Sequence, residues 1–247
     1  MFERFDDTRA LKRLLDRDPV ANGILVRDLC IDKGQYRVWR DGGSVLATRG
    51  KRVLFGGDWS VKEVPFGLLP RAPFMASAAP IEVYHQVCRK YAMAWKSPCW
   101  TLVAPRPKRP KGGWENLERL RWKDAPIVAK LWSLHDNPLP HIRECIRKYP
   151  SACIHVDGEL AAWAGNHFVT DRAAELGFAH TKRKYRRRGF GRRLTVDLTH
   201  KLYEMGLTPY CYVFKTNEAS YNMCKQVGFE ELGDVAWFGA KRLKKRF

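Results

Sequence analysis

The strongest periodic pattern of apolar residues lies in the last third of the chain. Five apolar side chains recur there at intervals of three or four positions: Phe190, Leu194, Leu198, Leu202 and Met205. That spacing places them on one face of a helix. Gly206 follows directly, and glycine is the residue that most often ends a helix in the left-handed conformation. The pattern therefore predicts a helix from Phe190 to Met205.

Alternating apolar and polar positions predict strands around this helix. A hairpin is expected over 151–168, with its turn at Asp157-Gly158, because an acidic residue followed by glycine suits a tight turn. The other elements expected in this half are strands at 116–122, 174–181, 209–214 and 235–240, and helices at 124–132, 140–149 and 217–228. Their order is β-α-α-β-β-β-α-β-α-β, which indicates a mixed α/β structure with a meander of antiparallel strands followed by two helical crossovers.

The first half of the chain has weaker patterns of the same kind. Leu11, Leu14 and Leu15 indicate a first helix, and a second is expected over 21–30. Residues 35–57 read as a hairpin and a further strand, with a turn at Asp41-Gly42-Gly43. A helix is predicted over 80–95 and a strand over 99–105. The two hairpins share an acidic-glycine turn, which fits either an ancient duplication or the repeated use of common turn chemistry.

A break in composition divides the chain into two domains. The segment APRPKRPKGG, residues 104–113, has three prolines, four basic residues and two glycines, as solvated linkers do. We therefore predict one domain over 1–112 and another over 113–247. The predicted fold class is α/β in the broad sense (α+β), with a mixed, mostly antiparallel central sheet and flanking helices.

Composition adds bounds on the class of protein. Of the 247 residues 45% are apolar, so the chain can bury a core. Its net charge of +19 indicates a negatively charged partner, which is nucleic acid, an anionic membrane or an acidic ligand. The seven cysteines form no CxxC pair, so neither a zinc site nor any other metal is expected, and reduced thiols suggest a cytoplasmic protein. No run of about 18 apolar residues occurs, so we expect no membrane span.

The most charged stretch, KRKYRRRGFGRR at 182–193, lies between a predicted strand and the predicted helix. The first turn of a helix has unpaired N–H groups and a positive dipole end. Glycine lets the backbone approach a phosphate without a Cβ in the way, and arginine adds charge. Arg186, Gly189 and Gly191 therefore form an R-x-x-G-x-G loop suited to a diphosphate.

This loop resembles the coenzyme A pyrophosphate loop of the GNAT superfamily of acyl-CoA-dependent N-acyltransferases. A second likeness is NEASYNMCKQVGF at 217–229, similar to the closing helix of that family. Segments 141–163, 174–191 and 210–220 resemble the glycine N-acyltransferase branch, although Glu144 stands between Arg143 and Cys145 where that branch has none. The resemblance covers about residues 115–247. It implies a GNAT fold preceded by a degenerate GNAT-like N-terminal half, which has no R-x-x-G-x-G loop.

The resemblance also implies roles for residues of this chain. Glu175 matches the catalytic base, and backbone N–H groups near Phe178, Ala179 and His180 would polarise the thioester carbonyl. Contacts with the cosubstrate, acetyl-CoA or another acyl-CoA, are expected from Arg186, Arg187, Arg188, Gly189, Phe190, Gly191, Arg192, Asn217 and Ser220. In that family a tyrosine often acts as the general acid that protonates the leaving thiolate. Cys224 stands at its position here, so Tyr221 is the candidate for this role.

Each of these residues also has a structural explanation that leaves function open. Glu175 fits a solvated strand end, Tyr221 fits core packing, and Asn217 fits the N-cap of its helix. Trp163, Asn166 and His167 are weak candidates for the acceptor pocket, and His180 for a proton relay.

The predicted activity is direct transfer of an acyl group, acetyl in the first instance, to a primary amine such as glycine in a ternary complex. The alternatives are a non-catalytic acyl-CoA sensor of GNAT fold and a nucleic-acid-binding protein, for which the charge is the only support.

Overall fold

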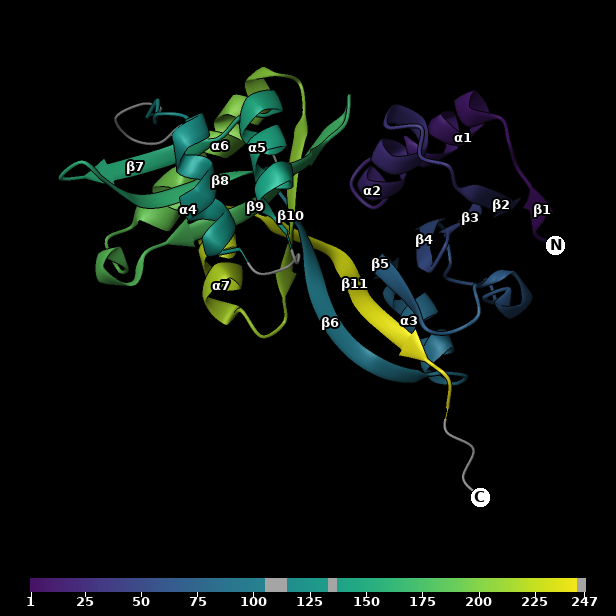
Figure 1. Ribbon diagram of the computed structural model, residues 1–247. Coiled ribbons are helices and arrows are strands. Elements are labelled where there is room, and N and C mark those ends of the chain that lie inside the picture. The colour runs from purple at the N-terminus through teal and green to yellow at the C-terminus, as the bar shows by residue number, and fades with distance from the viewer. Residues whose placement is uncertain (105–114, 133–136, 244–247) are drawn as a thin grey trace. The chain divides into compact units, whose positions relative to one another are not determined.

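The computed structural model describes residues 1–104, 115–132 and 137–243, so most of the predicted linker lies outside the described residues (Figure 1). The chain packs as two compact units. Unit 1 comprises residues 1–101, 213–216 and 232–247, and unit 2 comprises residues 102–212 and 217–231. The chain thus enters unit 1 again near its C-terminus. The division at 112/113 stays a prediction from composition.

Unit 1 is a sheet with short helices. Its helices are α1 (Thr8–Leu15), α2 (Gly23–Leu25), the π-helical η1 (Val26–Ile31), the 3-10 helix η2 (Phe66–Leu68) and α3 (Ile81–Cys88). Its strands are β1 (Glu3–Arg4), β2 (Arg37–Asp41), β3 (Ser44–Arg49), β4 (Arg52–Gly57), β5 (Phe74–Pro80), β6 (Ala92–Val103) and β11 (Glu230–Lys241), of which β6 and β11 reach the unit's boundary. The strand order is β1-β2-β3-β4-β5-β11-β6. Apolar side chains of α3, β4, β5 and β11 share one core.

One predicted element of unit 1 is wrong in its extent. The helix expected over 80–95 ends at Cys88, and β6 begins at Ala92. The helical spacing of apolar residues continues through Tyr91, but that ring packs against Phe66 and Phe74 as part of the core instead of extending the helix. Tertiary packing therefore overrides the local pattern.

Unit 2 carries the elements on which the predicted function depends. Its helices are the 3-10 helix η3 (Trp122–Asp124), α4 (Ala125–Lys130), α5 (Leu139–Lys148), the 3-10 helix η4 (Arg183–Tyr185), α6 (Phe190–Glu204) and α7 (Glu218–Gln226). Its strands are β7 (Ala152–Val156), β8 (Glu159–Val169), β9 (Ala173–Thr181) and β10 (Thr208–Phe214), the last of which reaches the unit's boundary, and they lie in the order β10-β9-β8-β7. The short strand expected at 116–122 is reduced to a single bridge from Glu118 to Cys153.

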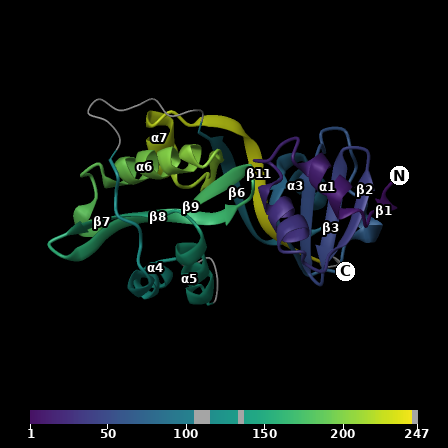
Figure 2. The same cartoon turned by 90° about the horizontal axis from the view of Figure 1, so that it is seen from above.

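The sheet of unit 2 is covered on both faces, as Figure 2 shows, with α4 and α5 on one side and α6 and α7 on the other. Alternation along the strands explains the two layers, because successive side chains of a strand point to opposite faces. Cys153 and Trp163 pack with α4 and α5, whereas the neighbouring Ile154, Ala162 and Ala164 pack with α6. The predicted apolar stripe of α6 is confirmed at Leu194, Leu198 and Leu202, which are buried, but not at Met205, which follows the last helical residue and is 55% exposed.

Two compensating irregularities shape the pairing of β8 with β9. One extra residue of β9 lies between the pairs Gly165–Gly177 and Trp163–His180, which makes a bulge at Phe178 and Ala179. Within the bulge Phe178 has a positive φ of 31°. A second extra residue, His167, lies in β8 between the partners of Leu176 and Glu175. The Phe178 ring packs directly over Gly165, where a Cβ would overlap it.

The seven cysteines are free, and no helix in the described residues has the length and apolar character needed to cross a membrane.

We predict that Gly165→Ala destabilises the protein by about 1–3 kcal/mol, because the added methyl group forces the Phe178 ring out of its place. Urea unfolding followed by tryptophan fluorescence measures the change. Gly67→Ala is the control, since a Cβ at Gly67 meets no described atom within 4 Å. Equal stability of the two variants would refute the close packing of Phe178 on Gly165.

Candidate functional site

Strands β9 and β10 run parallel over a short length and then part. Their register pairs Ala173 with Thr208 and ends at the pair Glu175–Tyr210. In the described part of the chain, the registered partners of β9 beyond Glu175 all belong to β8. In open α/β sheets, ligands commonly bind beside the carboxyl-terminal ends of adjacent parallel strands, so the unpaired halves of β9 and β10 are the place to expect one.

The N-terminus of α6 follows β9 and is left open. Gly189 is the N-cap residue, with φ 75° in the left-handed region, and no side chain caps the first turn among the described residues. A Cβ added at Gly189 or Gly191 would meet nothing within 4 Å. The first turn thus has no side-chain cap and leaves room beside its two glycines, as an anion site at a helix N-terminus requires.

One carboxylate anchors the basic loop. Glu159 accepts hydrogen bonds from Lys182 at 3.0 Å, from the Tyr185 hydroxyl at 2.7 Å, and from Lys184. These bonds lower the pKa of Glu159 to about 2, and the bond from Lys184 has the largest effect. Tyr185 is buried, and its ring lies under Lys184 and Arg188. Part of the positive charge of 182–193 therefore holds the loop itself in place.

The five arginines from position 186 to 193 divide into two groups. Arg193 forms a bidentate pair with Glu115, and Arg186 donates to the Thr181 carbonyl at 3.2 Å. Arg187, Arg188 and Arg192 are exposed. Exposed guanidinium groups beside an open helix N-terminus are suited to bind phosphate oxygens.

Glu175 lies at the point where β9 and β10 part. It is buried, with 6% of its surface exposed, and it faces Tyr210 in the register. The buried thiol of Cys211 lies near enough to Glu175 to be affected by its charge, and it is 3.9 Å from the buried thiol of Cys224. The hydrogen bond with Cys224, burial and the charge of Glu175 raise the pKa of Cys211. The spacing of Cys211 and Cys224 in the sequence gave no sign that they meet.

Residues of α7 have local partners. Asn217 caps the helix, because its side chain accepts the Ser220 N–H at 3.2 Å, so the predicted N-cap is confirmed. The Tyr221 hydroxyl donates to Glu231, and this bond, with burial, raises the pKa of Tyr221. Tyr221 is thus oriented toward Glu231, and its role as an acid stays a prediction.

Among the weaker candidates, Trp163 is a core residue and stacks on His180, with ring centroids 5.1 Å apart. Burial lowers the pKa of His180, and so do the charges of Arg186 and Lys182. Asn166 is fully buried and donates to the Pro150 carbonyl at 2.8 Å. His167 accepts the Phe178 N–H at its Nε2 atom, at 3.2 Å.

The structure also reveals a cluster that the sequence analysis missed. His141, Cys145 and His167 bring three potential ligand atoms within 4.8 Å of one another, and Glu118, Cys153 and His155 form a second group of this kind. His141 and Cys145 lie four residues apart and share one face of α5, and no CxxC spacing marks them. An H-x-x-x-C pair on a helix was the available signal.

We predict that Glu159→Gln lowers stability at pH 7, because the basic loop loses its anchor. The pKa of Glu159 is about 2 in the folded protein against an ordinary value of 4.5, so its contribution is complete above pH 4.5 and is lost as the pH falls toward 2. Urea unfolding of both proteins between pH 7 and 3 should show a gap that stays constant down to about pH 4.5 and narrows below it. A gap that widens on acidification would contradict this.

Comparison with known proteins extends these findings. Residues 154–238 match the model of the FR47-like protein family. Glycine N-acyltransferase-like protein 1 of Homo sapiens is 31% identical over 98 residues, which are 39% of this chain and 31% of the relative. The match thus spans about a third of the length of that relative.

Solved structures match over nearly the whole chain. A Drosophila protein determined by a structural genomics consortium covers 97% of this chain and 98% of its own, with a TM-score of 0.69 and 17% identity. A tandem GNAT protein from the clavulanic acid biosynthesis pathway covers 99% of both chains, with a TM-score of 0.56 and 12% identity. These matches confirm the two-part GNAT fold predicted from the sequence. The chain thus has a GNAT fold, and its residues 154–238 resemble the FR47-like family.

Proposed function

We propose that the chain is an N-acyltransferase that moves an acyl group from acyl-CoA to a small primary amine. The observation that carries the proposal is the end of the β9–β10 pairing at Glu175–Tyr210, combined with the open N-terminus of α6, the helix that follows β9. A space between two strands suits an extended thioester arm, and the helix N-terminus suits a diphosphate. Both features lie in unit 2.

The diphosphate of coenzyme A would bind backbone N–H groups of residues 187–192. Arg187 and Gly189 have φ angles of 65° and 75°, so the chain turns sharply before α6 begins. Successive N–H groups in such a turn form a concave anion site. The exposed Arg187, Arg188 and Arg192 add charge-assisted hydrogen bonds, and the 3′-phosphate of the cosubstrate offers further acceptors.

The bulge of β9 selects which backbone amide polarises the thioester carbonyl. The Phe178 N–H is held by His167, so it is committed inside the sheet. Ala179 is exposed and has no Cα partner among the described pairs of β8 and β9. Its N–H is the donor that we assign to the carbonyl oxygen, where negative charge develops as the amine attacks.

Glu175 would accept the proton that the amine loses. The amine nitrogen forms a bond to the thioester carbon, the carbon–sulfur bond breaks, and coenzyme A leaves as a thiolate that takes up a proton from solvent. A buried carboxylate at the parting of the strands suits a base, because its position is fixed by the sheet on both sides. Tyr221 is the alternative to solvent as donor of that proton, in which case its hydrogen bond to Glu231 breaks.

The matched relative is named as glycine N-acyltransferase-like, so glycine is the acceptor that we propose first, with other small amines next. The acyl group proposed first is acetyl.

Gly191→Asp is expected to weaken coenzyme A binding at least tenfold without loss of stability. Aspartate is favourable in the first turn of a helix, and a Cβ at this position meets nothing within 4 Å, so the variant should fold. Its charge, however, repels the diphosphate. Isothermal titration calorimetry with coenzyme A measures the effect, and Gly67→Asp makes the same change of charge outside the loop. Equal affinity of the two variants would exclude this loop as the diphosphate site.

For Glu175→Gln we predict a loss of about 10²–10⁴-fold in kcat with coenzyme A affinity nearly unchanged, since only the proton acceptor is removed. Thiol release from acetyl-CoA with glycine, and then with a panel of amines, gives kcat. Glu230→Gln, at an exposed position, is the control. If the unmodified protein binds acetyl-CoA but acylates no amine, the chain is a binding protein; if Glu175→Gln retains full activity, another group is the base.

A further inference from the structure

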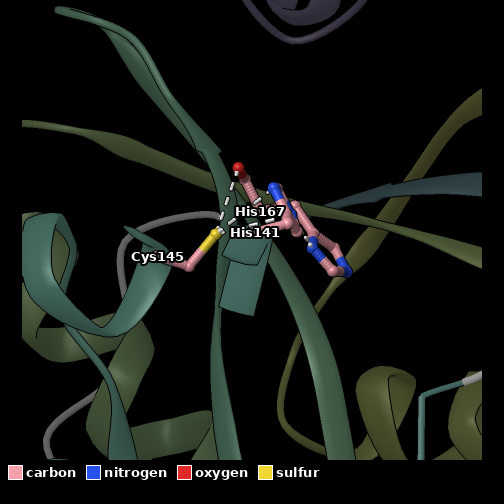
Figure 3. A group of neighbouring side chains, drawn as sticks. All are labelled: His141, Cys145 and His167. Carbon is pink, nitrogen blue, oxygen red and sulfur yellow. Dashed lines mark hydrogen bonds between the residues drawn. The ribbon is translucent and has the colours of Figure 1, made fainter. Parts of the chain in front are cut away.

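The cluster of His141, Cys145 and His167 lies outside the proposed acyl-transfer residues. Figure 3 shows the three side chains converging, with His141 and Cys145 from α5 and His167 from β8. The Nε2 atom of His141 is 3.2 Å from Nδ1 of His167 and 3.4 Å from Sγ of Cys145. Cys145 and His167 are buried, with 2% and 9% of their surfaces exposed, and His141 is half-buried.

These distances are close to those between the ligands of a tetrahedral zinc ion. With Zn–N bonds of about 2.0–2.1 Å and Zn–S bonds of about 2.3 Å, a tetrahedron separates two nitrogens by about 3.3 Å and a nitrogen from sulfur by about 3.6 Å. The two measured separations lie within about 0.2 Å of these values. Each of the three residues offers a ligand atom within 4.8 Å of the other two, and we expect a rotation of the Cys145 side chain to complete the site.

The surroundings hold the two imidazole rings in place. The Trp132 ring stacks on both, with centroids 4.6 Å from His167 and 5.5 Å from His141. His167 also packs on Gly177, where a Cβ would overlap its ring. Rings fixed in this way lose little rotational freedom when they bind an ion, which favours binding.

The hydrogen bond from Phe178 distinguishes the metal-free state from a metal-bound one. Because His167 Nε2 accepts the Phe178 N–H, the ring proton of neutral His167 lies on Nδ1 and points to His141. A cation at Nδ1 moves that proton to Nε2, where it faces the Phe178 N–H. Two donors then oppose each other, so the bond from Phe178 must break. Metal binding and this bond are mutually exclusive.

We propose that His141 Nε2, Cys145 Sγ and His167 Nδ1 form a site for a borderline-soft divalent cation of the zinc type, and that its occupancy releases the Phe178 amide from His167. Imidazole and thiolate ligands select zinc over magnesium or calcium. The proton balance is simple: Cys145 loses its thiol proton to solvent as its sulfur binds the ion, and the proton of His167 moves from Nδ1 to Nε2. The proposal is independent of acyl transfer.

The second group, of Glu118, Cys153 and His155, serves as an internal comparison. Burial raises the pKa of the Cys153 thiol to about 11, so its thiolate is hard to form. Glu118 is 61% exposed and is paired with Arg121 at 2.8 Å. Cys153 and His155 thus offer the same residue types beside an exposed, already paired carboxylate, and their variants are matched controls.

The first test is a titration of the full chain, under reducing conditions without chelator, with Zn²⁺ and with Co²⁺ as its spectroscopic substitute. We expect one ion per chain, a thiolate-to-cobalt charge-transfer band and tetrahedral d–d bands. Cys145→Ser should abolish the charge-transfer band, and both Cys145→Ser and His141→Ala should weaken zinc binding at least tenfold. Cys153→Ser and His155→Ala should leave the charge-transfer band and the zinc affinity unchanged. No binding, or binding that Cys145→Ser and His141→Ala do not alter, would overturn the site.

The second test follows the Phe178 amide by hydrogen exchange, resolved by NMR. Zinc should accelerate its exchange in the unmodified protein and leave it unchanged in Cys145→Ser. An amide that stays equally protected in the zinc-bound protein would contradict its release. Neither readout depends on catalysis, so a failure of the proposed acyl transfer does not affect the result.

Discussion

The pairing of β9 is the constraint on which the rest of unit 2 depends. Up to Glu175 the strand has partners on both sides, and beyond Glu175 its registered partners belong to β8. An extra residue then forms the bulge, and the Phe178 N–H turns to the His167 ring. Because the strand is held on the β8 side, its other edge is free to face a ligand. Three groups then follow one another along the chain: the buried carboxylate of Glu175, the exposed Ala179 and the open N-terminus of α6.

Electrostatics explains why a chain with a net charge of +19 forms an ordered loop at its most basic stretch. Like charges this close repel one another, and Glu159 offsets part of that repulsion by binding two lysines and Tyr185. Arg193 is paired with Glu115 in the same way. The exposed arginines that remain face solvent beside α6, where a polyanionic cosubstrate would bind. Charge and spacing therefore act together in this loop.

Much of unit 2 could be predicted because its signals are local: the apolar stripe of α6, the turn at Asp157-Gly158 and the glycines of the loop each determine nearby backbone. The contacts that join distant segments were not predictable in this way. The meeting of Cys211 with Cys224, the bond from Tyr221 to Glu231 and the bulge at Phe178 depend on strand register. Of the cluster of His141, Cys145 and His167, the sequence shows only one part: His141 and Cys145 have the four-residue spacing that places two side chains on one helix face.

The most direct test of this account is a crystal structure of the chain with coenzyme A bound. We predict the pyrophosphate on the N–H groups of residues 187–192, and the pantetheine arm between β9 and β10 beyond the pair Glu175–Tyr210, with its thiol end toward Ala179. Coenzyme A bound elsewhere, or bound at the loop with its arm outside the two strands, would contradict the account.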